Sequence, residues 1–241
     1  MISTVTLGAV EQAFSQGGNR LCFVDPGDNR RCIKVPRHDR TPEIKRAKKR
    51  GLAKLKPLTS FDDNHEEFLV FQRIARLVGD EAFELLPRCY GYFETEYGPG
   101  LCSELIRDDD GQISMSLKQY LWLYGYTDEL KLVVEQFRQR WQVLAIPSRN
   151  LLLHNIVVQM VSEKISRLVV IDGLGWPDLI PFAYYCKSMA RRKAARKASR
   201  LNGAIEKLLT IKATDGEWGY HGWLSDEKRQ AGLTQQDRGS V

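Results

Sequence analysis

Short apolar runs separated by turn-forming residues dominate the first part of the chain. Leu21–Asp25 and Arg31–Val35 flank a Pro-Gly-Asp-Asn segment, a composition typical of a hairpin turn. Cys89–Glu94 and Leu101–Ile106 form a second pair around a Gly-Pro-Gly segment, which we interpret as another turn. These runs predict a small antiparallel sheet.

Between the two pairs, a longer periodic segment predicts one helix. The Asp-Asp-Asn sequence at 62–64 supplies N-cap residues, and the helix is expected from about His65 to Val78. Its apolar face is formed by Phe71, Ile74 and Val78. Glu67 lies on the same face because it precedes Phe71 by four positions. We therefore expect Glu67 to be the carboxylate that this helix directs towards the sheet.

The second half of the chain changes to helical periodicity. Leu117–Tyr126 is apolar and aromatic, and Glu129–Ile146 predicts an amphipathic helix. The apolar stripe of that helix is formed by Leu130, Val133, Phe137, Trp141 and Leu144. Two short apolar runs, Ile156–Val158 and Leu168–Ile171, predict an inserted hairpin. The remainder, from Phe182, is expected to be mainly helical.

This order of elements predicts the fold class. A strand-rich first part with one helix, followed by a mainly helical second part, is typical of an α+β protein with two lobes. A chain of 241 residues, of which 43% are hydrophobic, is long enough for one domain of this kind. We expect a single domain over residues 1–241, with an N-lobe at about 1–106 and a C-lobe at about 107–241.

Composition narrows the class of protein further. The longest apolar runs are too short to cross a bilayer. The first residues lack a basic segment followed by an apolar one, so we expect a cytoplasmic protein. The five cysteines and four histidines are scattered, without a CxxC pair. This distribution argues against a zinc site or a disulfide framework.

Positive charge is concentrated in two blocks, although the formal net charge is only +6. The first block is residues 37–56, of which 38–56 are expected to form a loop or an exposed helix, and the second, residues 187–200, contains no acid. The second block lies on a predicted helix, whose small apolar face is mostly alanine. Its cationic side chains are Arg192, Lys193, Arg196, Lys197 and Arg200. They suit an anionic membrane surface at the inner membrane or a phosphorylated ligand; a solvated helix face is the alternative. No nucleic-acid recognition motif accompanies them.

Several polar residues form a series that suits ATP. Phosphoryl transfer requires a turn close to the phosphates, a lysine held by a carboxylate, and oxygen ligands for magnesium. The nucleotide-binding candidates are the turn residues Gly17 and Gly18, the strand residue Lys34, the helix residue Glu67, and Glu104 in the segment that joins the two halves. Singly, each has an ordinary structural explanation, such as a strand lysine that extends to solvent. Their order along the chain favours the nucleotide interpretation.

Asn155 and Asp172 are the metal-ligating candidates. Asn155 follows a loop and precedes a strand, and Asp172 directly follows another strand. Amide and carboxylate oxygens are ligands that Mg²⁺ accepts. We therefore expect ATP and Mg²⁺ as cofactors.

The same series resembles the protein-kinase motif set. Residues 32–34, Cys-Ile-Lys, resemble the V-A-I-K strand. Residues 148–155, Ser-Arg-Asn-Leu-Leu-Leu-His-Asn, resemble the catalytic loop H-R-D-L-x-x-x-N. Residues 172–175, Asp-Gly-Leu-Gly, stand where D-F-G would stand, with the glycine one place late. The resemblance implies a two-lobed kinase-like fold in which Lys34 contacts phosphates and Asn155 and Asp172 bind Mg²⁺.

More closely, the chain resembles the bacterial YrbL family, described as PhoP regulatory network proteins and grouped with kinase-like folds. The stretches that carry this resemblance are Leu21–Phe23, Arg31–Val35, Leu86–Gly91, Asn155–Val157 and Asp172–Gly175. It spans residues 7–200, and it implies the same fold and nucleotide chemistry.

One residue departs from the kinase pattern. Asn150 occupies the place of the catalytic-loop aspartate, and an amide cannot accept a proton from an attacking hydroxyl. Asn150 can still orient the nucleophile beside Asp172, and His154 is an alternative base. Two hypotheses follow: an ATP-dependent phosphotransferase, or a regulatory pseudokinase that binds nucleotide or a protein partner without turnover. A basic binding module that has lost nucleotide binding is a third.

The sequence after Asp172 bears on the phosphoryl acceptor. It contains no A-P-E motif, which in protein kinases ends the activation segment. A dedicated platform for protein substrates is therefore not expected. By analogy with small-molecule kinases, the expected acceptor is a small molecule, a sugar or a lipid-linked group.

Overall fold

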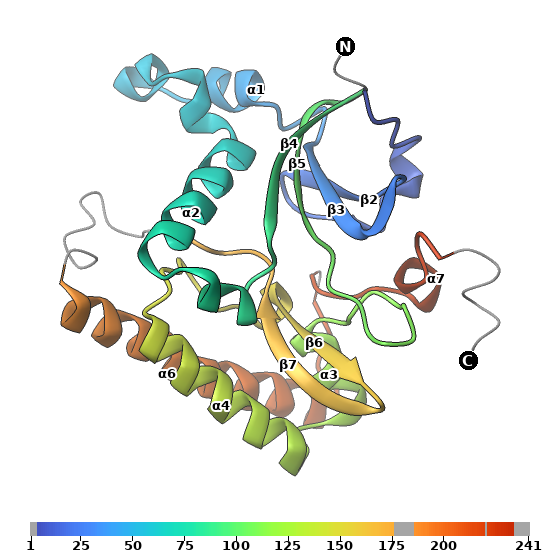
Figure 1. Ribbon diagram of the computed structural model, residues 1–241, viewed down its shortest axis with the longest axis vertical. Helices are drawn as coiled ribbons and strands as arrows, with labels where there is room; N and C mark the ends of the chain where they lie inside the picture. The colour runs from blue at the N-terminus through green and yellow to red at the C-terminus, as the bar shows by residue number, and fades with distance from the viewer. Residues whose placement is uncertain (1–3, 176–185, 220, 234–241) are drawn as a thin grey trace.

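The computed structural model describes residues 4–175, 186–219 and 221–233. The chain forms a sheet-rich N-terminal part and a mainly helical C-terminal part, which lie one above the other in Figure 1. This arrangement confirms the predicted α+β class with an antiparallel N-terminal sheet. Phe182, where the helical remainder was expected to begin, lies outside the described residues.

The N-terminal part is built on a five-stranded antiparallel sheet with the order β1-β2-β3-β5-β4. The strands are β1 (Ser15–Gln16), β2 (Arg20–Asp25), β3 (Asp28–Pro36), β4 (Cys89–Thr95) and β5 (Gly98–Glu104). Phe23 of β2 and Ile33 of β3 pair across the ladder and are buried in one hydrophobic cluster. Because side chains alternate along a strand, Cys22 and its partner Lys34 point to the opposite face.

The two predicted turns of the sheet have different outcomes. The first is confirmed, because Asp25 pairs with Asp28 and leaves a two-residue Pro-Gly turn. The second is wrong: Gly98-Pro99-Gly100 begins β5, and the turn lies at residues 96–97. Gly100 serves strand packing instead, since a Cβ there would lie 2.5 Å from Cγ2 of Ile33.

Helix α2 (Asp63–Leu77) follows the sheet's first three strands and closely matches the predicted helix. The Asp62 carboxylate caps it by accepting the N–H of Asn64 at 2.9 Å, which confirms the expected N-cap. Phe71 and Ile74 of α2 are buried, as predicted, whereas Val78 is the C-cap residue of the helix. The basic stretch before α2 contains the short helix α1 (Pro42–Ala47).

The C-terminal part contains the remaining helices and a separate two-stranded sheet. These elements are α3 (Leu117–Tyr124), α4 (Asp128–Leu144), β6 (Ile156–Val161), β7 (Lys164–Val170), α6 (Lys187–Ala213) and α7 (Asp226–Arg229). Single 3-10 turns occur at Val10–Gln12, Gly51–Leu55, Leu58–Phe61, Asp80–Glu84 and Leu153–Asn155. On α4, the buried stripe includes Val134 where Val133 was predicted, and Val133 is only partly buried.

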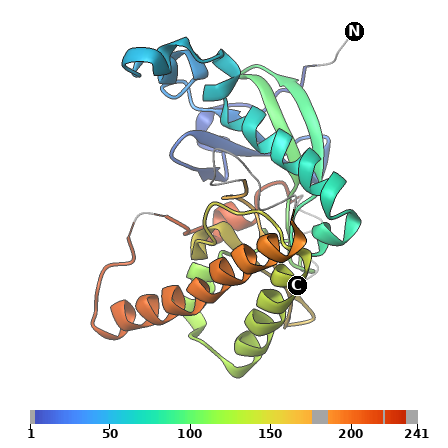
Figure 2. The ribbon, with the colours of Figure 1, turned by 90° about the vertical axis from the view of Figure 1, so that its left-hand side faces the viewer.

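Helix α6 uses its apolar face inside the C-terminal part. It packs beside α4, as Figures 1 and 2 show. The residues buried along it are Ala190, Ala194, Ala198, Leu201, Ile205 and Leu208. This face is therefore not available for insertion into a bilayer, and any contact with a membrane would rest on the exposed cations. Within the described ranges, no helix is both long and apolar enough to span a membrane.

Candidate functional site

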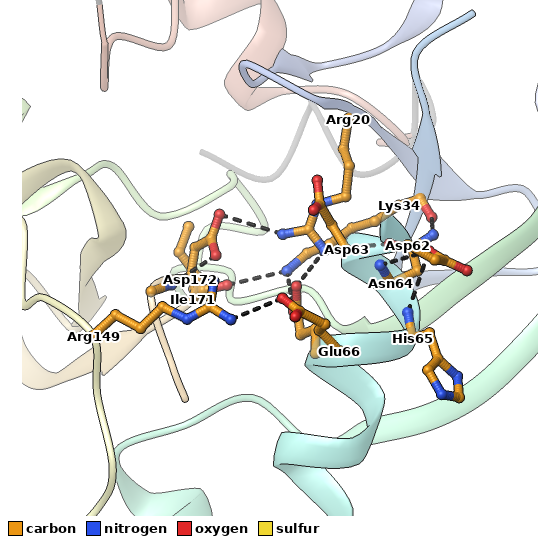
Figure 3. Close-up of polar contacts among 12 residues, drawn as sticks. Arg20, Lys34, Asp62, Asp63, Asn64, His65, Glu66, Arg149, Ile171 and Asp172 are labelled. Carbon is orange, nitrogen blue, oxygen red and sulfur yellow. Dashed lines mark hydrogen bonds and ion pairs between the residues drawn. The ribbon is translucent and has the colours of Figure 1, made fainter. Parts of the chain in front are cut away.

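Lys34 lies in β3 on the face of the sheet that points towards the C-terminal part. Its ammonium donates to Oε1 of Glu67 at 2.7 Å. It also donates to the carbonyl of Ile171 at 3.1 Å (Figure 3). Only 9% of each of the Lys34 and Glu67 side chains is exposed. Burial disfavours the charged ammonium, but the nearby negative charges, Glu67 first and Asp172 after it, together outweigh that effect and raise the pKa of Lys34. The lysine–carboxylate contact expected from the sequence is therefore present, and the lysine carries its charge.

Arg20, the first residue of β2, is a second cation at this position that the motif pattern did not include. It pairs with Glu67, and its Nη2 lies 3.3 Å from Oδ2 of Asp172 (Figure 3). Strand alternation was the available signal, because Arg20 and Cys22 share one face and Cys22 pairs with Lys34. Two cations therefore converge on one buried carboxylate.

Asn64 ties these groups to the backbone. Its Nδ2 donates to the carbonyl of Lys34 at 2.8 Å, and its Oδ1 accepts from Nη1 of Arg20 at 3.2 Å. Asn64 is buried in the first turn of α2, so it fixes that helix against β3. Its predicted role was N-capping, and its contact with the strand was not foreseen.

Asp172 follows β7 and leaves 55% of its side chain exposed to the cleft. Its Oδ1 accepts the N–H of Gly173 at 2.6 Å. Desolvation opposes ionisation of the carboxyl, but Arg20 and Lys34 outweigh it and lower the pKa of Asp172. The carboxylate is therefore ionised at neutral pH and keeps an accessible side.

Gly173 allows the Asp172 turn and the loop at 148–155 to approach closely. It adopts a φ of +81°, and a Cβ there would lie 2.7 Å from the Asn150 carbonyl oxygen and 2.9 Å from Nδ2 of Asn155. The glycine after Asp172 is thus required by both backbone conformation and space.

We expect Gly173→Ala to lower the free energy of unfolding by about 1–3 kcal/mol, because the φ is strained for alanine and the loop must move. Urea unfolding followed by circular dichroism measures this. Gly203→Ala is the matched control: Gly203 lies within α6 and a Cβ there would meet no atom within 4 Å. The control should be neutral or stabilising, and equal losses in both variants would contradict the argument.

Two adjoining cavities open between the N-terminal and C-terminal parts. The first, of about 230 Å³, is lined by apolar and thiol groups such as Phe14, Cys32 and Leu105. The second, of about 370 Å³, is lined by charged groups that include Arg20 and Asp172. The residues that line both are Ser15, Gln16, Cys22, Lys34, His154, Ile171, His221 and Gly222. A largely apolar cavity that adjoins a charged one suits a ligand with an apolar base and an anionic tail.

Gly17 and Gly18 lie in the turn between β1 and β2 and line the charged cavity. Neither has a positive φ, and a Cβ at Gly18 would meet no atom within 4 Å. The fold itself does not demand glycine at these positions. They line the same cavity as Lys34, and without side chains they leave that part of its wall open.

Glu104 ends β5 and lines the apolar cavity. Its carboxylate accepts the N–H of Arg88 at 3.0 Å and lies 3.6 Å from Arg167. The side chain of this predicted nucleotide-binding residue is thus engaged in contacts that join β5 to the start of β4 and to β7. Its position at the cavity agrees with the expectation, but its carboxylate has a structural role.

Asn150 is exposed in the loop that follows α4, and neighbouring elements hold that loop from two sides. Nη2 of Arg149 pairs with Oε2 of Glu66 on α2 at 2.8 Å (Figure 3). Lys197 of α6 donates to the Arg149 carbonyl, and its Nζ lies 3.5 Å from Oδ1 of Asn150. The basic helix therefore reaches the loop at Asn150, a contact that no sequence motif indicated.

His154, the alternative base, lines both cavities and stacks near His221, with 5.5 Å between the ring centroids. Burial and the neighbouring His221 and Lys118 lower the pKa of His154. The imidazole is therefore neutral at pH 7.

Asn155 and Asp172 both line the charged cavity, and their amide and carboxylate oxygens are of the kind that Mg²⁺ accepts. Mg²⁺ is commonly held by one or two carboxylates together with phosphate oxygens and waters. In the described part of the chain, no group of three or more His, Cys, Asp or Glu side chains could hold an ion alone. These residues therefore suit a metal shared with phosphates better than an independent metal centre.

Comparison with known proteins defines the family. Residues 9–205 match the model described as PhoP regulatory network protein YrbL. The chain belongs to the YrbL family. Two relatives, each described as "Uncharacterized protein YrbL", come from Escherichia coli strain K12 and Shigella flexneri. Each is 28% identical over 183 residues, which cover 75% of this chain and 78% of the relative.

One similar solved structure is described as Rad53 1-466 in complex with AMP-PNP. It is 13% identical with a TM-score of 0.48, and the match covers 94% of this chain and 51% of that chain. The YrbL-family chain thus spans about half the length of the Rad53 chain. A likeness at this level carries no conclusion about function.

In this YrbL-family chain, the cationic residues of α6 differ in exposure. Arg192, Arg196 and Arg200 are exposed, whereas Lys193 and Lys197 are half-buried. The contact of Lys197 with the loop at Asn150 places the helix next to the charged cavity. An anionic ligand or membrane surface for these residues stays a prediction.

Proposed function

We propose that this chain is a kinase-like protein that binds ATP with Mg²⁺ and transfers a phosphoryl group. The observation that carries this proposal is the buried Lys34, which Glu67 holds at 2.7 Å beside a cavity that Asp172 and Asn155 also line. A charged lysine fixed by a carboxylate, next to oxygen ligands, is the arrangement that phosphoryl transfer uses. The two parts of the chain act as the lobes of one domain, in a cytoplasmic protein.

Each residue has a role in this proposal. The base enters the apolar cavity beside Glu104, and the phosphates lie under Gly17 and Gly18, where Lys34 contacts them. Asn155 and Asp172 supply oxygen atoms to the metal. Bound Mg²⁺ would neutralise charge on the phosphates.

Arg20 adds a feature to this site. It pairs with Asp172 at 3.3 Å, so the aspartate's negative charge is partly neutralised without a metal. Nucleotide phosphates would attract Arg20, and the metal would take its place beside Asp172. Asp172 would therefore have a positive partner in both states: Arg20 before binding and the metal after it.

The acceptor is proposed to be a small molecule, a sugar or a lipid-linked group. The absence of an A-P-E motif after Asp172 supports this class over a protein substrate. Asn150 lies where the acceptor hydroxyl would approach and orients it by hydrogen bonding, because an amide cannot remove its proton.

A regulatory pseudokinase is the second candidate function, and Asn150 is the observation that favours it. In that case the same site binds nucleotide, and the bound state signals to a partner without turnover. Asp172 and Lys34 keep their binding roles, so nucleotide affinity is common to both candidates and turnover separates them.

Thermal unfolding with ATP and Mg²⁺ tests the binding site. At about 100-fold excess over Kd, a ligand stabilises the native state by about 2.7 kcal/mol. For a chain of this size that corresponds to a rise in Tm of about 5–10 °C. We expect Lys34→Ala and Asp172→Ala to lose most of this rise.

Lys164→Ala is the control for this experiment, because Lys164 is an exposed lysine at the start of β7. It should retain the full rise. The proposal fails if the native protein gains no stability from ATP with Mg²⁺, or if Asp172→Ala gains as much as the native protein.

A further inference from the structure

The segment at residues 221–231, which we call the C-terminal strap, crosses the outer side of the apolar cavity. It includes α7, which in Figure 1 lies on the side of the molecule opposite α2 and below β2 and β3. His221, Gly222, Trp223, Leu224 and Lys228 line the cavity from this side. The family match ends at residue 205, so the strap lies beyond the matched region.

The first half of the strap is fixed to α3. The Gln119 side chain donates to the Leu224 carbonyl at 2.8 Å and accepts the Leu224 N–H at 2.9 Å. Ser116 Oγ donates to the Gly222 carbonyl at 2.5 Å, and Lys118 donates to the His221 carbonyl at 2.9 Å. Successive backbone groups of the strap thus find partners on one helix, which fixes its path.

The second half of the strap is fixed to the segment between β5 and α3. Nη2 of Arg229 lies 2.8 Å from Oδ2 of Asp108, and only 11% and 5% of these side chains are exposed. Backbone pairing reinforces the ion pair, because the Ile113 N–H donates to the Arg229 carbonyl at 2.7 Å. A buried charge pair of this kind is costly to break on one side only.

One contact extends the strap to the N-terminal part. Nζ of Lys228 donates to the Ala13 carbonyl at 3.0 Å. The strap therefore touches both parts of the molecule as well as the segment that joins them. It is placed to hold the width of the cleft as well as to cover the cavity.

The strap also packs closely against the cavity wall. Gly222 adopts a φ of +94°, and a Cβ there would lie 2.6 Å from Cβ of His154. Leu224 packs against the hydrophobic cluster of Phe14, Cys32, Leu105 and Ile113. Removing the strap would expose this cluster to water, which disfavours an undocked state.

We propose that the C-terminal strap is part of the nucleotide-binding site: it forms the outer wall of the base cavity, and nucleotide affinity depends on its docking. This inference rests on the proposed function and adds a segment that no kinase motif includes. Leu224, which packs against the cluster of Cys32 and Leu105, contributes an apolar surface to the wall that contacts the base, and the Arg229–Asp108 pair keeps that wall closed. The strap recognises the planar base, because Trp223, Leu224 and Lys228 line only the apolar cavity of the two, and only His221 and Gly222 reach the charged one.

The test compares three variants of the full chain. Arg229→Gln breaks the anchor to Asp108, and Lys228→Ala removes only the contact with Ala13 from an exposed side chain. Glu227→Gln is the matched control on the same helix, because Glu227 is exposed. Two quantities are measured: the Kd for ATP with Mg²⁺ by calorimetry, and the rate of Cys32 alkylation without nucleotide by mass spectrometry.

Cys32 is a suitable reporter because it is buried and lines only the apolar cavity of the two. Cys186 is exposed outside these cavities and serves as the internal reference for alkylation. We expect Arg229→Gln to raise both the Kd and the relative alkylation rate of Cys32 by about tenfold. Lys228→Ala should raise both by about two- to threefold, and Glu227→Gln should change neither.

The outcomes separate this inference from the proposed function. If the native protein does not bind ATP, the proposed function fails, and the alkylation rate alone decides whether the strap closes the cavity. If Cys32 reacts equally fast in the native protein, Arg229→Gln and Lys228→Ala, the strap is not a wall of the cavity. Should Arg229→Gln fail to fold, the Kd and the Cys32 alkylation rate of Lys228→Ala decide the proposal. Unchanged affinity with faster alkylation would also overturn the proposal, because affinity would then not depend on docking.

Discussion

Replacing Glu67 by glutamine should lower the free energy of unfolding by about 3–5 kcal/mol. Glu67 is the shared partner of Lys34 and Arg20, whose side chains are only 9% and 12% exposed. Glutamine keeps the shape of the side chain but leaves two buried positive charges without their carboxylate. The variant therefore suffers both the loss of attraction and the repulsion between the cations.

Denaturant unfolding of the ligand-free protein measures this effect, and pH gives a second check. Glu67 raises the pKa of Lys34, so this lysine contributes stability at pH values below its unfolded pKa and loses it only as the pH rises through the folded value. The difference between native protein and variant should therefore stay constant from about pH 6 to 9, well below the usual lysine pKa.

Glu66→Gln is the matched control for this prediction. Glu66 is the neighbouring residue on α2 and pairs with Arg149, but 46% of its side chain is exposed. A surface pair of this kind contributes about 0–1 kcal/mol. Similar losses in Glu66→Gln and Glu67→Gln would contradict the argument that burial makes the Glu67 pair different.

The Lys34–Glu67 pair could be predicted because both residues belong to regular, periodic segments. The alternation of the apolar strand indicates which way Lys34 points. The apolar face of the helix does the same for Glu67. The N-cap at Asp62 and the glycine after Asp172 were predictable for the same reason, since each depends on a few neighbouring residues. Local pattern therefore identified the Lys34–Glu67 pair and the N-cap of α2, but not the other contacts around the cleft.

Arg20 and the strap were not predicted, because their contacts join distant segments; for Arg20, strand alternation gives its face but not its partners. Arg20 begins a strand, where an arginine ordinarily reaches solvent, and only the placement of α2 and Asp172 buries it. The strap is held through backbone carbonyls and one ion pair, which leave no apolar periodicity in its sequence. The turn assigned to Gly98–Gly100 was wrong because glycine occurs both in turns and where a strand packs closely against its neighbour. The sequence alone does not distinguish the two cases, and Gly100 is of the second kind.

The loop at Asn150 links the proposed chemistry to the basic helix. Lys197 lies 3.5 Å from Oδ1 of Asn150 and donates to the neighbouring carbonyl, so a cation stands where an acceptor and the transferring phosphate would meet. This position suits stabilisation of negative charge in a transition state. The missing group is a base, and its restoration should show whether the remaining parts are correctly placed.

Asn150→Asp should raise the rate of ATP turnover by about 10²-fold or more, because a positioned general base contributes about 10²–10⁴ in rate. The new carboxylate has almost the same shape as the amide and gains an ionic partner in Lys197, so the loop should keep its conformation. The measurement is the initial rate of phosphate release with Mg²⁺, in the presence and absence of candidate small-molecule, sugar and lipid-linked acceptors.

Two variants make this result interpretable. Asn29→Asp is the matched control, because Asn29 is exposed at the start of β3 and the substitution introduces the same charge away from the loop. The turnover rate of this variant should equal that of the native protein. Adding Lys34→Ala to Asn150→Asp should remove the gain if the activity belongs to the proposed site. If Asn150→Asp binds ATP as tightly as the native protein and its rate does not rise, the loop does not place residue 150 where it could accept a proton from the acceptor. The pseudokinase function would then be the better explanation of the Lys34 and Asp172 site.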